Sequence, residues 1–251
     1  MSVNVNSTSA DGYWEHTHTG TNAADVVGDA TTSATNFKTN ATNLNRAVRN
    51  RTFGVRGSSD SSFRCTRSYF EFDLSGFTGT ATDADFKFYS DSIGSINYNQ
   101  IYVVEAAALD GSAADFGNVF GTSGTTLGTL LAEGQVSSTA QYHTITGNSA
   151  LLSKINANVG SGTLTVGVMG YYDYRLAAGI STSWPGAGSS NYTQIEIFYN
   201  ESGGKEPILE VTGISAASSG YSHNVLGVSS ANIASVKGVA TANIDNIIGV
   251  D

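Results

Sequence analysis

One stretch in the first half of the chain, from Arg67 to Gly76, constrains the fold more than any other. Phe70, Phe72 and Leu74 fall on one face of an extended segment, and Glu71 and Asp73 fall on the other. This period of two predicts a strand in a sheet that is packed on one side and exposed to water on the other. The chain is therefore expected to build its core from strands.

Further segments show the same alternation or continuous apolar runs. They are residues 84–90, 100–105, 142–146, 164–168, 193–199 and 207–212. One short helix is predicted at 150–156, because Asn148 suits its N-cap and Leu151, Leu152 and Ile155 share a helical face. The fold class predicted is all-β, a jelly roll or β-sandwich with one short helix, plus a small C-terminal repeat segment. A turn is expected at 75–80, a long loop at 111–134, and an extended continuation at 170–175.

Composition supports strands and excludes several partners. Only 13% of residues are charged and 29 are Gly, as in sheets with neutral polar surfaces and many turns. The net charge of −9, without a basic run, opposes binding of a phosphate backbone, so we expect no nucleic acid. No apolar run approaches membrane-spanning length, and the first residues do not resemble a secretory signal. We expect no membrane partner.

Several single residues are candidates for a structural, metal-binding or ion-pairing role. Trp14 is expected to anchor an opening strand, and Cys65, without a flanking motif, is interpreted as a small buried strand residue. His16 and His18 share a face of an extended segment and could hold a metal, but two exposed histidines are the simpler interpretation. Six of the twelve Lys and Arg residues form one concentration, expected to pair with carboxylates across a sheet or subunit boundary: Arg46, Arg49, Arg51, Arg56, Arg64 and Arg67.

Three fragments carry a resemblance to a known family. They are residues 67–75 followed by 84–89, residues 142–156 leading into 164–173, and residues 205–212. In this order they resemble the DNRLRE-type domain over about residues 60–213. The resemblance implies a jelly-roll module of the kind found in surface and secreted proteins, often associated with carbohydrate binding. It implies no single activity and no particular binding residues.

The C-terminal segment repeats itself with a period of eleven residues. A Val-x-Gly-Val pattern begins at Val225 and at Val236 and returns as Ile-Ile-Gly-Val at Ile247, and Ala-Asn-Ile recurs between the units. Units this small cannot bury their apolar side chains alone, so they must pack on another surface. The residues expected to mediate assembly are Val225, Leu226, Val228, Ile233, Val236, Val239, Ile244, Ile247, Ile248 and Val250.

This tail resembles the segments that close many virion proteins of tailed bacteriophages. The resemblance implies a virion structural protein, either a capsid decoration (cement) protein or a tail or fibre component. It would be assembled in the host cytoplasm and exposed on the particle surface. The partners expected are other virion proteins and further copies of the chain, with a trimer as the working stoichiometry.

A carbohydrate-binding module is the alternative function. Tyr171, Tyr172, Tyr174 and Trp184 offer aromatic rings for stacking on a surface glycan. An enzyme is not expected, because Glu71 and Asp73 are interpreted as solvated acids and no nucleophile motif or phosphate loop occurs. No cofactor and no metal site are predicted; structural Ca²⁺ remains open, although no Asp-x-Asp-x-Asp run marks a site.

Four regions are predicted along the chain. Residues 1–59 form an N-terminal arm with the first strands, and residues 60–213 form the jelly-roll core. Residues 214–220 form a linker, because they are small and polar. Residues 221–251 carry the eleven-residue repeat for docking or oligomerisation.

Overall fold

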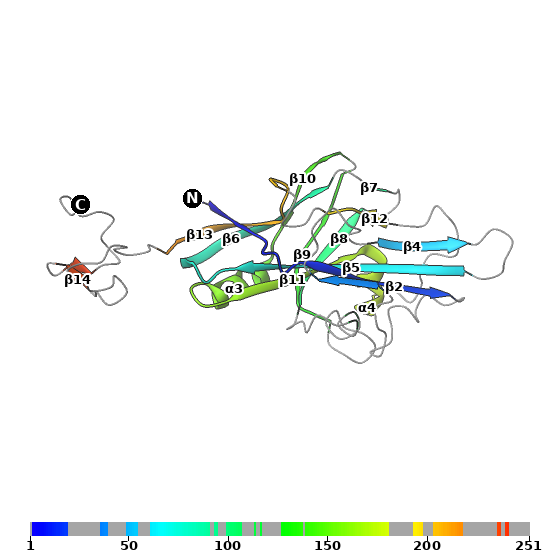
Figure 1. Ribbon diagram of the computed structural model, residues 1–251, viewed down its shortest axis with the longest axis horizontal. Helices are drawn as coiled ribbons and strands as arrows, with labels where there is room; N and C mark the ends of the chain where they lie inside the picture. Colours follow the sequence, from blue (N-terminus) through cyan, green and yellow to red (C-terminus); the bar gives the residue numbers. More distant parts are fainter. Residues whose placement is uncertain are drawn as a thin grey trace.

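Strand β5 (Ser61–Asp73) runs through the centre of the larger of two antiparallel sheets (Figure 1). The structure is a computed structural model that describes residues 2–19, 36–39, 49–54, 61–90, 93–94, 99–106, 113, 116, 127–137, 139–180, 193–197, 203–217, 235–236 and 239–240. Within these ranges the chain forms an all-β sandwich with few helices, as predicted.

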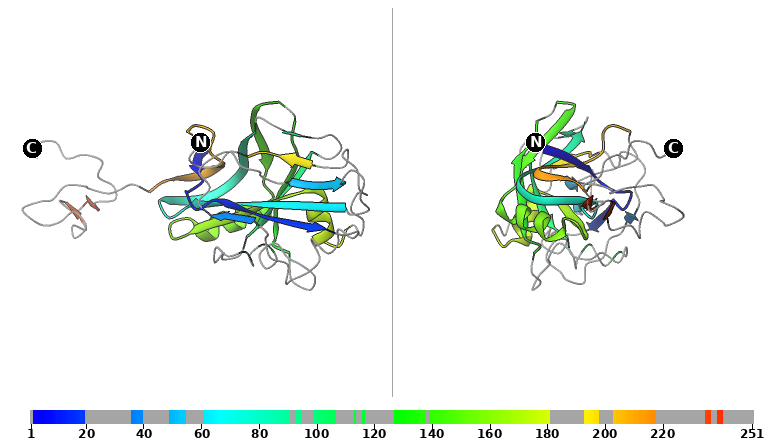
Figure 2. Two further views of the ribbon diagram at one scale, coloured as in Figure 1. Left: turned by 45° about the vertical axis from the view of Figure 1, so that its right-hand side comes forward. Right: turned by 90° about the vertical axis from the view of Figure 1, so that its left-hand side faces the viewer.

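The smaller sheet, sheet A, has four antiparallel strands. Their order across the sheet is β1 (Ser2–Asn6), β13 (Ile208–Ala216), β6 (Phe77–Ser90) and β10 (Gln141–Thr146). Sheet A packs against the larger sheet, as the two views of Figure 2 show.

The larger sheet, sheet B, is also antiparallel. Its main order is β7 (Ile93–Gly94), β12 (Thr193–Ile195), β4 (Arg49–Gly54), β5, β11 (Thr163–Gly170), β8 (Gln100–Glu105) and β9 (Leu130–Gln135). Strand β2 (Gly12–Thr19) pairs with β5 and with β3 (Asn36–Thr39).

The N-terminal residues belong to both sheets rather than to a separate arm. Strand β1 pairs with β13 in sheet A, Ser7 then pairs with Phe72 of β5, and β2 continues along β5 in sheet B. These strands lie in the region 1–59, where the sequence predicted an N-terminal arm with the first strands, and they pair with strands of the region 60–213. Trp14 of β2 is fully buried, which confirms its predicted anchoring role.

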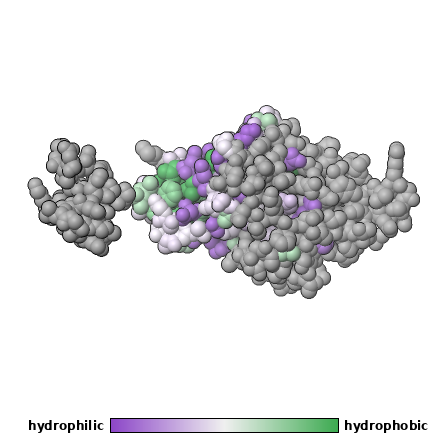
Figure 3. All heavy atoms as spheres, in the orientation of Figure 1, coloured by the Kyte–Doolittle hydropathy of each residue, from purple (hydrophilic) through white to green (hydrophobic). Residues whose placement is uncertain are grey.

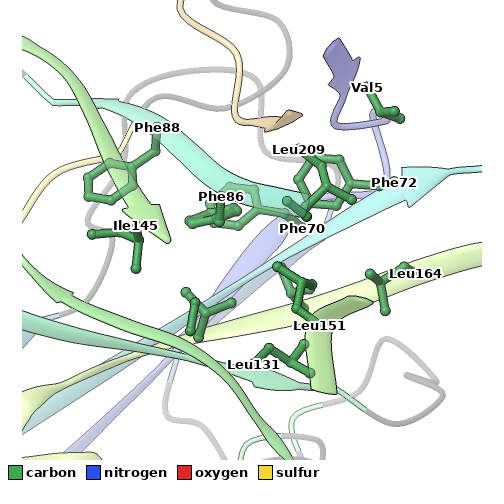
Figure 4. Packing of buried hydrophobic residues seen from close by; sticks show 14 of the residues in the cluster. Val5, Phe70, Phe72, Phe86, Phe88, Leu131, Ile145, Leu151, Leu164 and Leu209 are labelled. Carbon is green, nitrogen blue, oxygen red and sulfur yellow. The ribbon is translucent and has the colours of Figure 1, made fainter. Parts of the chain in front are cut away.

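The main core lies between the sheets and confirms the predicted alternation. Phe70, Phe72 and Leu74 are fully buried, and the first two face Phe86 at centroid distances of 6.0 and 6.2 Å. Figure 4 shows these rings pointing toward one another from β5 and β6. Tilted and edge-on contacts of this kind are the preferred geometry for aromatic pairs.

Helix α3 (Ser149–Asn158) packs along the core as predicted. The Asn148 side chain accepts hydrogen bonds from the backbone N–H groups of Ala150 and Leu151, so it caps the helix. Leu151 and Ile155 are the buried residues of the helix. The N-cap thus sets where the chain leaves β10 and turns into the helix.

A second apolar cluster covers the opposite face of sheet B, and here the one-sided prediction for β5 was wrong. Cys65, Arg67 and Tyr69 share the face of Glu71 but are buried. They are covered because helix α4 (Tyr171–Ala177) packs on this face, beside β11 and β8. Strand β8, between β11 and β9, is accordingly buried on both faces, as its continuous apolar run predicted.

Several predicted boundaries were wrong. The turn after β5 occupies only residues 75–76, because β6 begins at Phe77 and pairs with β13 from there. Strand β9 lies within the loop predicted at 111–134, and β13 continues through Ala216 into the predicted linker. Residues 171–177 form α4 instead of an extended segment.

Candidate functional site

Of the four aromatic residues predicted to bind a glycan, the structure describes the side chains of Tyr171 and Tyr174. Tyr174 is 8% exposed and stacks on Tyr102, with ring centroids 4.0 Å apart and planes 10° apart. Its ring belongs to the second cluster and offers no open face to a sugar. The prediction for Tyr174 was wrong because α4 turns this residue onto the sheet.

Tyr171, at the first position of α4, is half-buried. The guanidinium of Arg175, one helical turn later, lies 5.0 Å from the Tyr171 ring centroid, so it covers one face of that ring. Trp184 and the side chain of Tyr172 lie outside the described residues.

A buried ion pair joins α4 to β5. The Arg67 guanidinium donates from Nε and Nη2 to the two carboxylate oxygens of Asp173, each at 2.7 Å. Both side chains are fully buried. Two parallel bonds between an Arg and a carboxylate form the strongest ion-pair geometry available to side chains. Arg67 therefore pairs with a carboxylate, as predicted, but that carboxylate lies in helix α4 and not across a sheet or a subunit boundary.

Arg67 also holds a third segment of the chain. Its Nη1 donates to the backbone carbonyl of Phe116, and its guanidinium carbon lies 4.2 Å from the Phe116 ring centroid. Burial alone would lower the pKa of Arg67, but the charge and hydrogen bonds of Asp173 outweigh it and leave that pKa raised. Arg67 is therefore charged, and its guanidinium donates hydrogen bonds to Asp173 and to the Phe116 carbonyl.

The same cluster contains the Cys65 thiol. Burial raises the pKa of the Cys65 thiol well above its ordinary value, and the nearby charge of Asp173 raises it further. A protonated, buried thiol is a poor nucleophile. The Asp173 carboxylate accepts two hydrogen bonds from Arg67, and its charge also acts on the Cys65 thiol. The buried role predicted for Cys65 is confirmed.

The outer face of sheet A carries an aromatic pair that the sequence analysis did not single out. Tyr89 of β6 and Tyr142 of β10 oppose each other in the ladder, and their rings meet edge to face at 5.6 Å and 82°. The Tyr142 hydroxyl donates to the backbone carbonyl of Glu206 at 3.0 Å. The Lys205 ammonium lies 4.4 Å from the Tyr89 ring centroid. Both rings are half-buried.

The rest of this face is polar. Lys87 of β6 forms an ion pair with Glu210 of β13, and this hydrogen bond lowers the pKa of Glu210. Thr144 and Asn4 complete the face on the outer strands and are exposed. Around β1 and β13, Figure 3 shows hydrophobic and hydrophilic residues side by side. The face thus combines aromatic rings with hydrogen-bonding groups, as a surface for a polar ligand requires.

The structure describes the two candidate acids, Glu71 and Asp73, and one of the two candidate metal ligands, His16. Glu71 is half-buried and accepts a hydrogen bond from Thr8, and Asp73 is exposed and accepts from the backbone N–H of Ser75 at the turn. His16 is half-buried, with its ring 5.7 Å from the Phe116 ring, so the prediction that it is exposed was wrong. Within the described ranges, no group of three or more His, Cys, Asp and Glu residues is arranged to hold a metal ion.

The predicted assembly segment contributes one described element. Strands β14 (Ser235–Val236) and β15 (Val239–Ala240) pair with each other, with Val236 opposite Val239. Among the described strands they join neither sheet A nor sheet B. The other predicted assembly residues lie outside the described residues: Val225, Leu226, Val228, Ile233, Ile244, Ile247, Ile248 and Val250.

Comparisons with known proteins assign no family. No protein-family model matches the chain, and a search of curated proteins found no match. None of the described helices is long and apolar enough to cross a membrane.

Two features escaped the sequence analysis because they depend on long-range register. Arg67 and Asp173 are 106 residues apart, and only the packing of α4 on β5 brings them together. Tyr89 and Tyr142 meet because β6 and β10 pair in one register. The sequence did hold one signal for the tyrosine pair. Tyr89 follows Phe88 and Tyr142 precedes His143, and because neighbouring residues of a strand point to opposite faces, inward-facing Phe88 and His143 imply outward-facing tyrosines.

Proposed function

We propose that the chain is a structural protein of a bacteriophage particle that acts by protein–protein assembly. It would serve as a capsid decoration protein or as a tail or fibre component. The observation that carries the proposal is the strict eleven-residue repeat at the C-terminus, one unit of which forms the β14–β15 hairpin. The resemblance of this tail to those of tailed-phage virion proteins supports the assignment to a particle.

The repeat supports assembly because it needs a partner. An isolated two-stranded hairpin is marginally stable in water, and these strands have only two residues each. Small repeats gain stability only from neighbours that cover their apolar faces. Among the described strands, β14 and β15 pair only with each other. A second copy of the chain or another particle protein is the partner that this architecture favours.

The sandwich supports a scaffold role. The buried charges of Arg67 and Asp173 neutralise each other inside the sandwich. Charged residues make up only 13% of the whole chain, which leaves many neutral polar residues for contacts between copies. A rigid, weakly charged sandwich with an associating tail suits a repeated position on a particle.

The solution mass tests this proposal. Light scattering after size exclusion would compare the full chain with a chain ending at Gly220, with near-ultraviolet circular dichroism to check that the sandwich is folded. A full-length chain whose residues 221–251 are scrambled is the matched control, because it keeps length and composition but loses the period. We expect an oligomer for the full chain and monomers for both variants. A monomeric full chain, or an oligomer that survives scrambling, would reject the repeat as the assembly device.

A carbohydrate-binding function is the second candidate, favoured by the Tyr89–Tyr142 pair on the outer face of sheet A. Aromatic rings stack on the C–H faces of sugars, and the neighbouring polar groups can bond hydroxyls. Glycan-array binding of the full chain would test it. Tyr89→Ala and Tyr142→Ala should each abolish binding, whereas Tyr171→Ala, in helix α4, should not. Binding that depends on Tyr171 alone would assign the glycan to α4 instead.

A further inference from the structure

We propose that the outer edge of β1 pairs with β1 of a second copy of the chain, antiparallel and about a two-fold axis at Val3. The inference rests on the proposed assembly function and adds a contact between sandwiches, whereas the repeat acts through the tail. Every residue of this contact belongs to the described part of the chain. The contact would continue sheet A of one copy into sheet A of the next.

The other border of sheet A is covered. Strand β10 forms that border, and just beyond β10 Gly147 bridges to Ala132 of β9, so sheet B lies beside it. The part of β6 that lies beyond β10 is bonded by helix α3 instead. The Asn156 side chain accepts a hydrogen bond from the Ala81 N–H at 2.7 Å and donates one to the Ala81 carbonyl at 3.2 Å. Edges covered in this way do not recruit another strand.

Strand β1 forms the opposite border, and no described strand pairs with its outer side. Among the described strands it pairs only with β13, as Figure 1 shows. It contains no Lys and no Pro, and its register with β13 has no bulge. Those are devices that proteins use to block a sheet edge. At Ser7 the chain bridges to Phe72 of β5, so the stretch available for pairing is Ser2 to Asn4.

The hydrogen-bonding direction along β1 identifies the groups at this edge. The Ser7 N–H donates to the Pro207 carbonyl at 2.9 Å, toward β13. Hydrogen-bonded pairs alternate with non-hydrogen-bonded pairs in an antiparallel ladder, so Val3 also bonds to β13. The backbone N–H and C=O groups of Ser2 and Asn4 therefore point away from β13, toward the outer edge.

These groups match the same groups of a second copy. With Val3 on the two-fold axis, Ser2 lies opposite Asn4 of the second copy, and each such pair exchanges two hydrogen bonds, about four in all. The two Val3 residues then form a non-hydrogen-bonded pair on the inner face of the sheet. Val3 is half-buried there and packs against the main core. Val3 of the second copy would cover the side that remains exposed.

Charge also favours a second copy as the partner. The chain has a net charge of −9, but β1 contains only Ser, Val and Asn, so two such strands meet without like charges opposite each other. Glu210, which lies opposite Asn4 in the ladder, is paired with Lys87. A two-fold contact between identical strands satisfies the same groups on both sides, as isologous interfaces do.

The contact is too short to hold two copies together alone. Stable interfaces bury about 1,200–2,000 Å² in total, more than an edge of a few residues supplies. An oligomer held by the repeat carries several such edges, so the contacts can act together. A two-fold contact joins copies in pairs and cannot close the expected trimer. It would therefore link neighbouring oligomers and leave the mass in dilute solution unchanged.

Disulfide trapping in the full chain tests the register. Val3→Cys places two thiols at a non-hydrogen-bonded pair, whose Cα atoms lie about 4.5 Å apart, within the range of disulfides. Asn4→Cys is the matched control, because Asn4 is more exposed than Val3. In this register its two copies are separated by two residues along the strand and one strand spacing, about 8 Å, which is beyond disulfide reach. Cys65 is fully buried in both variants.

Mild oxidation at high protein concentration, followed by non-reducing electrophoresis, should give a covalent dimer for Val3→Cys and a monomer for Asn4→Cys. A mixture of Ser2→Cys and Asn4→Cys chains should also cross-link, because these exposed positions lie opposite each other. This second test does not alter the half-buried Val3. Near-ultraviolet circular dichroism would check that each variant is folded.

Random collision would favour the more exposed thiol, so a dimer of Asn4→Cys alone would overturn the register. Failure of both Val3→Cys and the mixture to cross-link would overturn the edge contact itself. Light scattering of the unmodified chain keeps this result separate from the proposed function. A monomeric full chain would reject the repeat as the assembly device, while the cross-links would still decide whether the edges pair.

Discussion

Removing one partner of the Arg67–Asp173 pair should destabilise the sandwich severely. Asp173→Asn keeps the size of the side chain but leaves the Arg67 guanidinium charged, fully buried and without its counterion. Breaking one side of a buried ion pair typically costs about 3–5 kcal/mol. Because a domain is stabilised by only about 5–15 kcal/mol in total, this one change should remove a large share of the free energy of unfolding.

A double-mutant cycle separates the interaction energy of Arg67 with Asp173 from the energy that each side chain contributes through its other contacts. Arg67→Met and Asp173→Leu should each cost about 3–5 kcal/mol, since each leaves one buried charge. The double variant leaves no charge and should cost only about 1–3 kcal/mol, mainly because the Phe116 carbonyl loses the bond from Arg67. The interaction energy between the two positions should therefore be at least about 3 kcal/mol.

Urea unfolding followed by circular dichroism measures each corner of this cycle. If the single variants are only partly folded at 25 °C, all four proteins are compared at a lower temperature. An additive cycle, in which the double variant costs the sum of the two singles, would refute the argument that the charges act as one buried unit. So would a cost below about 1 kcal/mol for Asp173→Asn, the range typical of exposed ion pairs.

Three further predictions concern single residues. Burial lowers the pKa of His143, whose Nε2 has no hydrogen-bond partner among the described residues. In the unfolded chain a His has a pKa of about 6.5, so the unfolded state binds the proton more readily than the folded state. The free energy of unfolding should therefore fall as the pH drops from 7.5 to 5. His143→Leu should remove that part of the pH dependence in urea titrations at several pH values. Gly213→Ala should cost more stability than Gly203→Ala: both have positive φ, but a Cβ at Gly213 would lie 2.3 Å from the Thr80 carbonyl oxygen, and at Gly203 no described atom lies within 4 Å. Thermal melts of the two variants check this order, and equal losses would contradict it. Asn148→Ala should cost about 0.5–2 kcal/mol by removing the cap of α3, whereas Asn148→Asp should retain most of it.

The alternation of Phe70, Phe72 and Leu74 was sufficient to predict the central strand and its inward face, because period-two burial is a local property of a strand. Asn148 was sufficient to predict where α3 begins, since capping depends only on residues two or three positions away. These features were confirmed.

Features that depend on what packs above a strand were not predictable in the same way. Tyr171 to Arg175 read as an extension of β11 because aromatic residues favour strands, yet they form α4. The helix covers the face of β5 that carries Arg67, which is why a face expected to be exposed is buried. Tertiary packing here outweighed local propensity.

For the candidate surfaces, the sequence supplied residue types but not their arrangement. It indicated aromatic residues for a ligand, but Tyr174 is buried against Tyr102, and the pair described on the outer face of sheet A is Tyr89 with Tyr142. That pair depends on strand register between segments more than 50 residues apart. The repeat, by contrast, is a sequence property, and the structure adds the hairpin formed by one unit.

Hydrogen exchange of the assembled full chain tests the central claim most directly. The measurement would follow backbone amides of residues 225–250 by mass spectrometry in the oligomer and in the control with a scrambled tail. If the repeat is the interface, these amides should exchange slowly in the oligomer and at unprotected rates in the control, while the sandwich exchanges alike in both. Unprotected exchange across residues 225–250 in the oligomer, with new protection confined to sheet A or sheet B, would contradict the account.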